Sequence, residues 1–193
     1  MSRIIRRVFA DLYGLPSWNV RKRHGSSLTF DFGEPRLEVE EAIERESPFG
    51  SRCVKRPTAV YGAWHLWICR SKWIMSQDGR EIGRPESDDP TIERACWVLD
   101  GQALTAVKVA AGGRTAFRFD LGGLLETMPS PDGKLAATWM LLCPDDRVLY
   151  QRSDGRYQLE PPDRTAPGSG GPSTTDVKRG TDGPDSHGTR HAQ

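Results

Sequence analysis

The sequence lacks the short motifs that identify many enzymes and nucleotide-binding proteins. It contains no G-x-x-x-x-G-K-S/T phosphate loop, no G-x-S-x-G nucleophile elbow and no H-E-x-x-H metal-binding pair. Histidine is scarce: His24 and His65 lie in the part expected to fold, and His187 and His191 lie near the C-terminus. Two histidines so far apart make no metal signature, so we expect neither a metal nor another cofactor.

Cysteine is also scarce, and its spacing suggests no pairing. Cys53, Cys69, Cys96 and Cys143 show no C-x-x-C spacing and no zinc-ligand pattern with histidine. The last three lie inside apolar runs, where cysteine is usually a buried, reduced thiol. This usage predicts four free, buried thiols and a cytoplasmic protein.

Long apolar runs and a strong net charge are absent as well. No stretch reaches transmembrane length, and the N-terminal arginines are not followed by the apolar core of a signal peptide. The net charge of +1 provides no overall field that would attract nucleic acid or an anionic membrane. The charge is uneven, however, because residues 1–30 contain six arginines and lysines against Asp11 alone.

Large apolar side chains are missing from residues 161–193, which are rich in glycine and proline. A segment with so little apolar surface to bury cannot offset the entropy lost on ordering, so we predict a disordered tail. The remaining length suits one domain. We therefore expect an N-terminal amphipathic helix within residues 1–16 and a single β-rich domain over residues 17–160.

Apolar and polar residues alternate through much of that domain. In residues 25–40, GSSLTFDFGEPRLEVE, the alternation predicts two strands joined by a turn at 33–35, with Asp31 and Glu38 on the solvated side. Residues 41–56 are charged and irregular, and are expected to be a loop. Residues 58–70 are apolar on both parities, which predicts a central strand covered on both faces. Similar patterns with Gly-rich turns continue to residue 151.

Two helices are predicted beside these strands. Residues 3–13 carry apolar side chains at helical spacing, and Asp88, Asp89 and Pro90 are typical of a helix start. The fold class expected is therefore α+β and mainly β: about eight or nine short strands in antiparallel sheets, folded into a sandwich or half-barrel, with an N-terminal helix and one helix near 89–100.

Two groups of residues are candidates for binding. Basic and aromatic residues in 18–24 suit nucleic acid, although a solvated charged connector has the same composition. A histidine in an aromatic strand, with a carboxylate nearby, suits a ligand or catalytic site, although most such histidines are hydrogen-bonded parts of a sheet. The candidates are Trp18, Arg21, Arg23, His24, Asp31, His65 and Trp67; none is assigned as catalytic or metal-binding.

Several stretches together resemble a family of small actinobacterial proteins without an assigned activity. They are WNVR at 18–21, GSSLTFDFGEP at 25–35, AWHLWI at 63–68, ESDD at 86–89, LDGQALTAV at 99–107 and FRFDLGG at 117–123. The likeness covers about residues 12–157, so it leaves the tail outside the domain. It implies no activity, cofactor or site residue.

An aromatic core without a recognisable catalytic group favours a non-catalytic cytoplasmic module that binds another protein, as immunity-like or defence-associated proteins do. An enzyme is the less favoured interpretation. Two alternatives stay open: a small-ligand or catalytic site near His65 and Trp67, and nucleic-acid contact through residues 18–24. The weak net charge disfavours nucleic acid.

Overall fold

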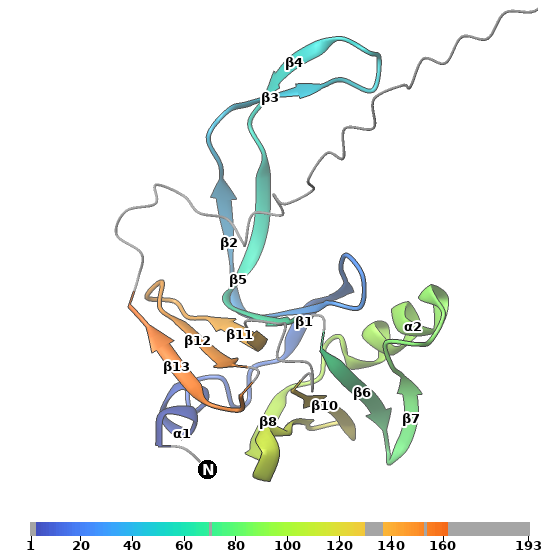
Figure 1. Ribbon diagram of the computed structural model, residues 1–193, viewed down its shortest axis with the longest axis vertical. Helices are drawn as coiled ribbons and strands as arrows, with labels where there is room; N and C mark the ends of the chain where they lie inside the picture. Colours follow the sequence, from blue (N-terminus) through green and yellow to red (C-terminus); the bar gives the residue numbers. More distant parts are fainter. Residues whose placement is uncertain (1–2, 70, 130–136, 153, 162–193) are drawn as a thin grey trace, which may run out of the picture.

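The computed structural model describes residues 3–69, 71–129, 137–152 and 154–161 (Figure 1). Within these ranges the chain forms thirteen strands and two α-helices, and the strands pair in antiparallel fashion. The predicted fold class, mainly β with antiparallel sheets packed in a sandwich-like way, is confirmed. From residue 162 onward, the tail predicted to be disordered, residues 161–193, lies outside the part of the chain that the structure describes.

Two sheets form the body of the molecule. The first has the order β1-β2-β5-β11-β12-β13, with β1 (Ser17–Lys22), β2 (Leu28–Val39), β5 (Thr58–Ile68), β11 (Ala137–Leu142), β12 (Val148–Arg152) and β13 (Tyr157–Glu160). The second has the order β7-β6-β10-β9-β8, with β6 (Lys72–Gln77), β7 (Arg80–Gly83), β8 (Leu104–Val109), β9 (Thr115–Phe119) and β10 (Gly123–Met128).

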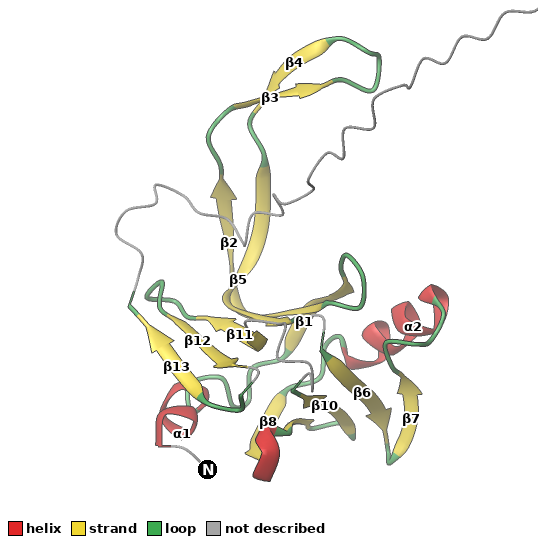
Figure 2. Cartoon of the chain, in the orientation of Figure 1, coloured by secondary structure: helices red, strands yellow, loops and turns green. Residues whose placement is uncertain are grey.

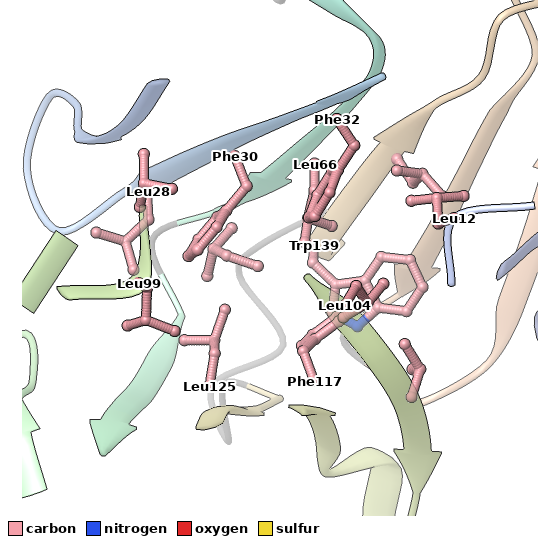
Figure 3. Close-up of a cluster of buried hydrophobic side chains, with 14 of the residues drawn as sticks. Leu12, Leu28, Phe30, Phe32, Leu66, Leu99, Leu104, Phe117, Leu125 and Trp139 are labelled. Carbon is pink, nitrogen blue, oxygen red and sulfur yellow. The ribbon is translucent and has the colours of Figure 1, made fainter. Parts of the chain in front are cut away.

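The hydrophobic core lies between these two sheets (Figure 3). Phe30 of β2 stacks on Phe119 of β9, with ring centroids 6.1 Å apart. Trp139 of β11 meets Phe117 of β9 edge to face at 5.7 Å. The helix α1 (Arg3–Phe9) adds Phe9, whose ring lies 5.9 Å from Trp139, so the predicted N-terminal helix belongs to the core. It ends at Phe9 rather than Tyr13.

The second helix, α2 (Asp89–Leu99), begins as the sequence predicts. Asp88 accepts a hydrogen bond from the Thr91 N–H at 2.9 Å and so caps the helix start. Its buried stripe, which includes Ile92 and Leu99, packs against β1, β6 and β7. Figure 2 shows the two helices on opposite sides of the body. Neither helix in the described ranges has the length and apolar character needed to cross a membrane.

The largest departure from the sequence prediction is in residues 28–60. The turn expected at 33–35 is absent, because β2 continues to Val39 and pairs with β5 along its length. A bulge between Phe32 and Pro35 accommodates the proline, which cannot donate a ladder hydrogen bond. The expected loop at 41–56 contains a hairpin of β3 (Ile43–Glu46) and β4 (Arg52–Lys55). Residues 36–60, here named the arm, project from the body (Figure 1).

The chain therefore has more strands than the eight or nine predicted. Residues 17–22 are a strand rather than a connector, and β3 and β4 are too charged for their alternation to be visible. The two-sided covering expected for residues 58–70 is also wrong. Leu66 and Ile68 are fully buried, whereas Tyr61 and Trp67, on the opposite face of β5, are only partly buried.

The four cysteines are free, but they are not all buried as predicted. Cys96 and Cys143 are buried and Cys69 is partly buried, whereas Cys53 on β4 is exposed because the arm has no core around it. Burial raises the pKa of the Cys96 thiol to about 12 and those of Cys69 and Cys143 to about 11. These three thiols are therefore unreactive at neutral pH.

Candidate functional site

Asp31 and His65 form a hydrogen-bonded pair on the outer face of the six-stranded sheet, which points away from the second sheet. Their neighbours Phe30 and Leu66 point into the core, so strand alternation turns Asp31 and His65 outward. The two residues are register partners on β2 and β5, and His65 Nδ1 lies 2.6 Å from Asp31 Oδ1. The Asp31 side chain is fully buried and that of His65 is 7% exposed.

Two further donors satisfy the Asp31 carboxylate. The Gly62 N–H donates to Oδ1 at 2.9 Å, and Asn19 Nδ2 donates to Oδ2 at 2.6 Å. Burial raises the pKa of Asp31, but these hydrogen bonds and the one from His65 outweigh it, so the pKa lies below its ordinary value of 3.8. Because Asp31 is ionised and accepts, His65 Nδ1 carries the proton.

Two backbone irregularities place these groups around Asp31. In β1 the register shifts between Trp18 and Arg21, and Asn19 there has a φ of 54°, in the left-handed region. In β5, a Cβ on Gly62 would stand 2.6 Å from backbone atoms of Phe32, so the bulge in β2 requires a glycine. Bulges redirect side chains, and both of these converge on one carboxylate.

Aromatic and basic side chains surround this pair on the outer face. The Tyr61 ring meets the His65 ring edge to face at 5.0 Å, and Trp67 lies on its other side at 6.5 Å. Arg23 Nε donates to Thr29 Oγ1 at 3.1 Å. A groove of about 580 Å³ opens beside Tyr61, and Arg23 also lines it.

Six of the seven residues predicted for binding lie on this outer face. Trp18, Arg21 and Arg23 line the groove, Asp31 pairs with His65, and Trp67 contacts the His65 ring. The seventh, His24, is exposed in the turn after β1 and does not line the groove. The two candidate groups, separate in the sequence, meet because the sheet places β1, β2 and β5 side by side.

The prediction that Asp31 is solvated beside Glu38 is wrong. Asp31 is buried because the fully paired β2 and β5 bring Gly62 and His65 against it, while Glu38 lies on the exposed arm. The candidate residues chosen from the sequence also leave out Asn19 and Tyr61. Asparagine tolerates a positive φ better than most residues, but nothing in the local pattern marks Asn19 as the residue at a bulge.

The arm is a second candidate region. In the arm, β2 and β5 form a two-stranded ribbon. Leu37 is 67% exposed, and its register partner Val60 is exposed beside it on the same face of this ribbon. Val39 follows on that face, and Val54 and Phe49 are exposed further out, with Phe49 at 94%. Within the described ranges, β2 beyond Pro35 and β5 before Ala63 pair only with each other, so the ribbon has two open edges.

The two legs of the arm carry opposite charge. Residues 36–46 contain two arginines and five glutamates, a net charge of −3. Residues 47–60 contain two arginines and one lysine and no carboxylate, a net charge of +3. The ribbon thus presents an apolar face between an acidic and a basic edge.

Comparison with known proteins assigns no relative to this chain. In the part of the chain described here, no three histidine, cysteine or acidic side chains gather as a metal site. The likeness to a family of small actinobacterial proteins stays a prediction. No family model, no curated protein and no solved structure matches the chain.

Proposed function

We propose that the protein is a non-catalytic module that docks on another protein through the arm, in the manner of an accessory or immunity-like protein. The observation that carries the proposal is the exposed apolar face of the ribbon, which includes Leu37, Val39 and Val60. A contiguous apolar patch on a projecting element is typical of an interaction surface. The free thiols favour a cytoplasmic setting.

The edges of the arm indicate how a partner would bind. An open strand edge offers unpaired backbone groups to an extended segment, which adds to the ribbon as a further strand. The basic leg, residues 47–60, favours an extended segment rich in acidic side chains. A strand added by a partner would also stabilise the arm, because an isolated two-stranded ribbon is only marginally stable in water.

Nucleic acid is a poorer candidate for the partner. The arm has no net charge over residues 36–60. Lys22, in the middle of the basic run 21–23, pairs with Asp89 at 2.8 Å and holds α2 rather than facing the groove. Strong phosphate binding needs several free cations on one surface, and these residues supply few.

The test compares two double variants on neighbouring rungs of the ribbon. Leu37→Ser with Val60→Ser makes one rung of the apolar face polar. Glu38→Ser with Ala59→Ser, a register pair on the opposite face, is the matched control. We expect a partner captured by the wild type and the control to be lost from the apolar-face variant. That partner should also bind the purified wild-type protein. The Kd of this complex should rise at least about tenfold for the apolar-face variant.

Two outcomes would contradict the proposal. One is a purified complex whose affinity is equal in the wild type and both variants. The other is self-assembly: if sedimentation shows wild-type oligomers that only the apolar-face substitutions dissociate, the arm binds further copies of this chain instead of a partner. The acidic edge of one copy is complementary to the basic edge of another, so sedimentation belongs in the same experiment.

A further inference from the structure

The groove on the outer face has the size and composition of a small-molecule site. Its volume of about 580 Å³ lies within the range of ligand pockets. Its lining includes Trp18, Asn19, Arg21 and Arg23 from β1 and its end, and Tyr61 from β5. Ala59 and Val60, at the base of the arm, also line the groove, so the groove borders the arm.

Two guanidinium groups supply the groove with positive charge. Arg21 and Arg23 are both exposed, and neither forms an ion pair with any residue in the described ranges. Arg23 uses Nε to bond Thr29, which fixes the side chain and leaves its two terminal nitrogens for a ligand. The one lining carboxylate, Asp100, accepts from the Val20 N–H. The groove therefore favours an anionic group.

Two rings give the groove fixed aromatic walls. Trp18 Nε1 donates to the Gly33 carbonyl at 3.0 Å, which sets the orientation of the indole. Tyr61 is held edge to face against His65, whose own orientation is set by Asp31. Rings held in place present their faces to a planar ligand with little loss of side-chain entropy.

The polar cluster beneath the groove supports the same interpretation. Asn19 lines the groove, and it is held by the buried Asp31 at the cost of a left-handed backbone conformation. Its Oδ1 atom is buried without a hydrogen-bond partner among the described residues. Strain and unsatisfied polar atoms at one place are typical of sites that hold a required geometry for binding.

We propose that this groove binds a small planar ring that carries one anionic group, either a carboxylate or a phosphate. The ring lies against Trp18 and Tyr61, and the anionic group accepts hydrogen bonds from Arg21 and Arg23. Asn19, Asp31 and His65 are positioning residues, which keep Tyr61 and the β1 bulge in place. The site borders the base of the arm through Val60, but the side chains proposed to hold the ligand lie on β1 and its end and at Tyr61, outside the arm.

The test is isothermal titration calorimetry on the full chain with four probes. Phenyl phosphate and benzoate carry both a ring and an anionic group. Inorganic phosphate lacks the ring, and benzyl alcohol lacks the charge. We expect at least one of the aryl anions to bind with a Kd below about 1 mM, and both single-feature probes to bind at least about tenfold more weakly. Which aryl anion binds more tightly separates carboxylate from phosphate recognition.

Variants assign the binding to the groove. Arg21→Gln and Arg23→Gln should each weaken the aryl anion about tenfold or more, and Tyr61→Ser should do the same by removing a ring. Arg118→Gln, an exposed arginine on the other sheet, is the matched control and should leave the Kd unchanged. The proposal is wrong if neither aryl anion binds at about 10 mM, or if binding survives both arginine variants unchanged.

Discussion

The strands β2 and β5 run through both the body and the arm, and the two regions differ in what covers one face of these strands. In the body, Phe30 of β2 and Leu66 of β5 are fully buried between the two sheets. Further along the same strands, Leu37 and Val60 occupy equivalent alternating positions and are largely exposed. The backbone pairing is continuous along both halves, apart from the bulge between Phe32 and Pro35.

The difference shows that strand pairing and burial are separate properties in this protein. Apolar side chains alternate along both halves of these strands. They form a hydrophobic core only where the second sheet packs on them. Asp31 and His65 lie close to where the covered half gives way to the arm, and Gly62 links them to the bulge by its hydrogen bond to Asp31. The four predictions that follow test this contrast, in order of decreasing effect.

Removing an aromatic ring from the body should have the largest effect. Phe30→Ala empties a fully buried site and should lower the free energy of unfolding by about 3–5 kcal/mol. Leu37→Ala, on the same strand in the arm, should change it by less than about 0.5 kcal/mol. Urea denaturation of the two variants measures both values, and similar losses would mean that the arm is packed in solution.

The Asp31 cluster should have an intermediate effect. Asp31→Asn keeps the shape but offers one oxygen to three donors, Gly62, His65 and Asn19, so stability should fall by about 1–3 kcal/mol at pH 7. The pKa of Asp31 is lower in the folded state, so its contribution is present above about pH 4 and is lost as the pH falls further. The difference between wild type and variant should therefore shrink below pH 4, as followed by thermal melts; a constant difference would mean that the charge of Asp31 does not stabilise the fold.

The reactivity of the thiols should differ between the arm and the body. This prediction involves no change in stability. Cys53, exposed in the arm, should react quickly with a thiol reagent in the folded protein at pH 8. Cys96 and Cys143 should react only when the protein unfolds. Burial holds the pKa values of these two thiols at about 12 and about 11. Mass spectrometry of the labelled peptides identifies each site, and early labelling of Cys96 would show that α2 opens readily.

Removal of the outer arm should affect the stability of the body only slightly. Replacing residues 40–57 by Asn-Gly joins Val39 to Thr58, which are register partners, through a hairpin turn. The removed segment buries little against the body, so the Tm should shift by no more than a few degrees. A much larger drop in differential scanning calorimetry would show that the arm supports the fold as well as binding.

Much of the body could be predicted from the sequence because its signals are local. The cap at Asp88, the buried stripe of α2 and the alternation around Phe117 each depend on residues close in the chain. The arm could not be predicted in the same way. Its outer strands, IERE and RCVK, have no apolar alternation, and the proline at position 35 is typical of a turn unless a bulge accommodates it.

The sequence by itself determined the strand-rich class, the helix start at Asp88 and the residue types available for a site, because periodicity and capping act over a few residues. Only the tertiary structure decided that Trp18, Asp31 and His65 meet, because they lie on three strands whose order in the sheet no local pattern encodes. It likewise decided that Phe30 is buried and Leu37 exposed. Burial depends on which sheet packs above a strand, and identical alternation on one strand carries no information about that.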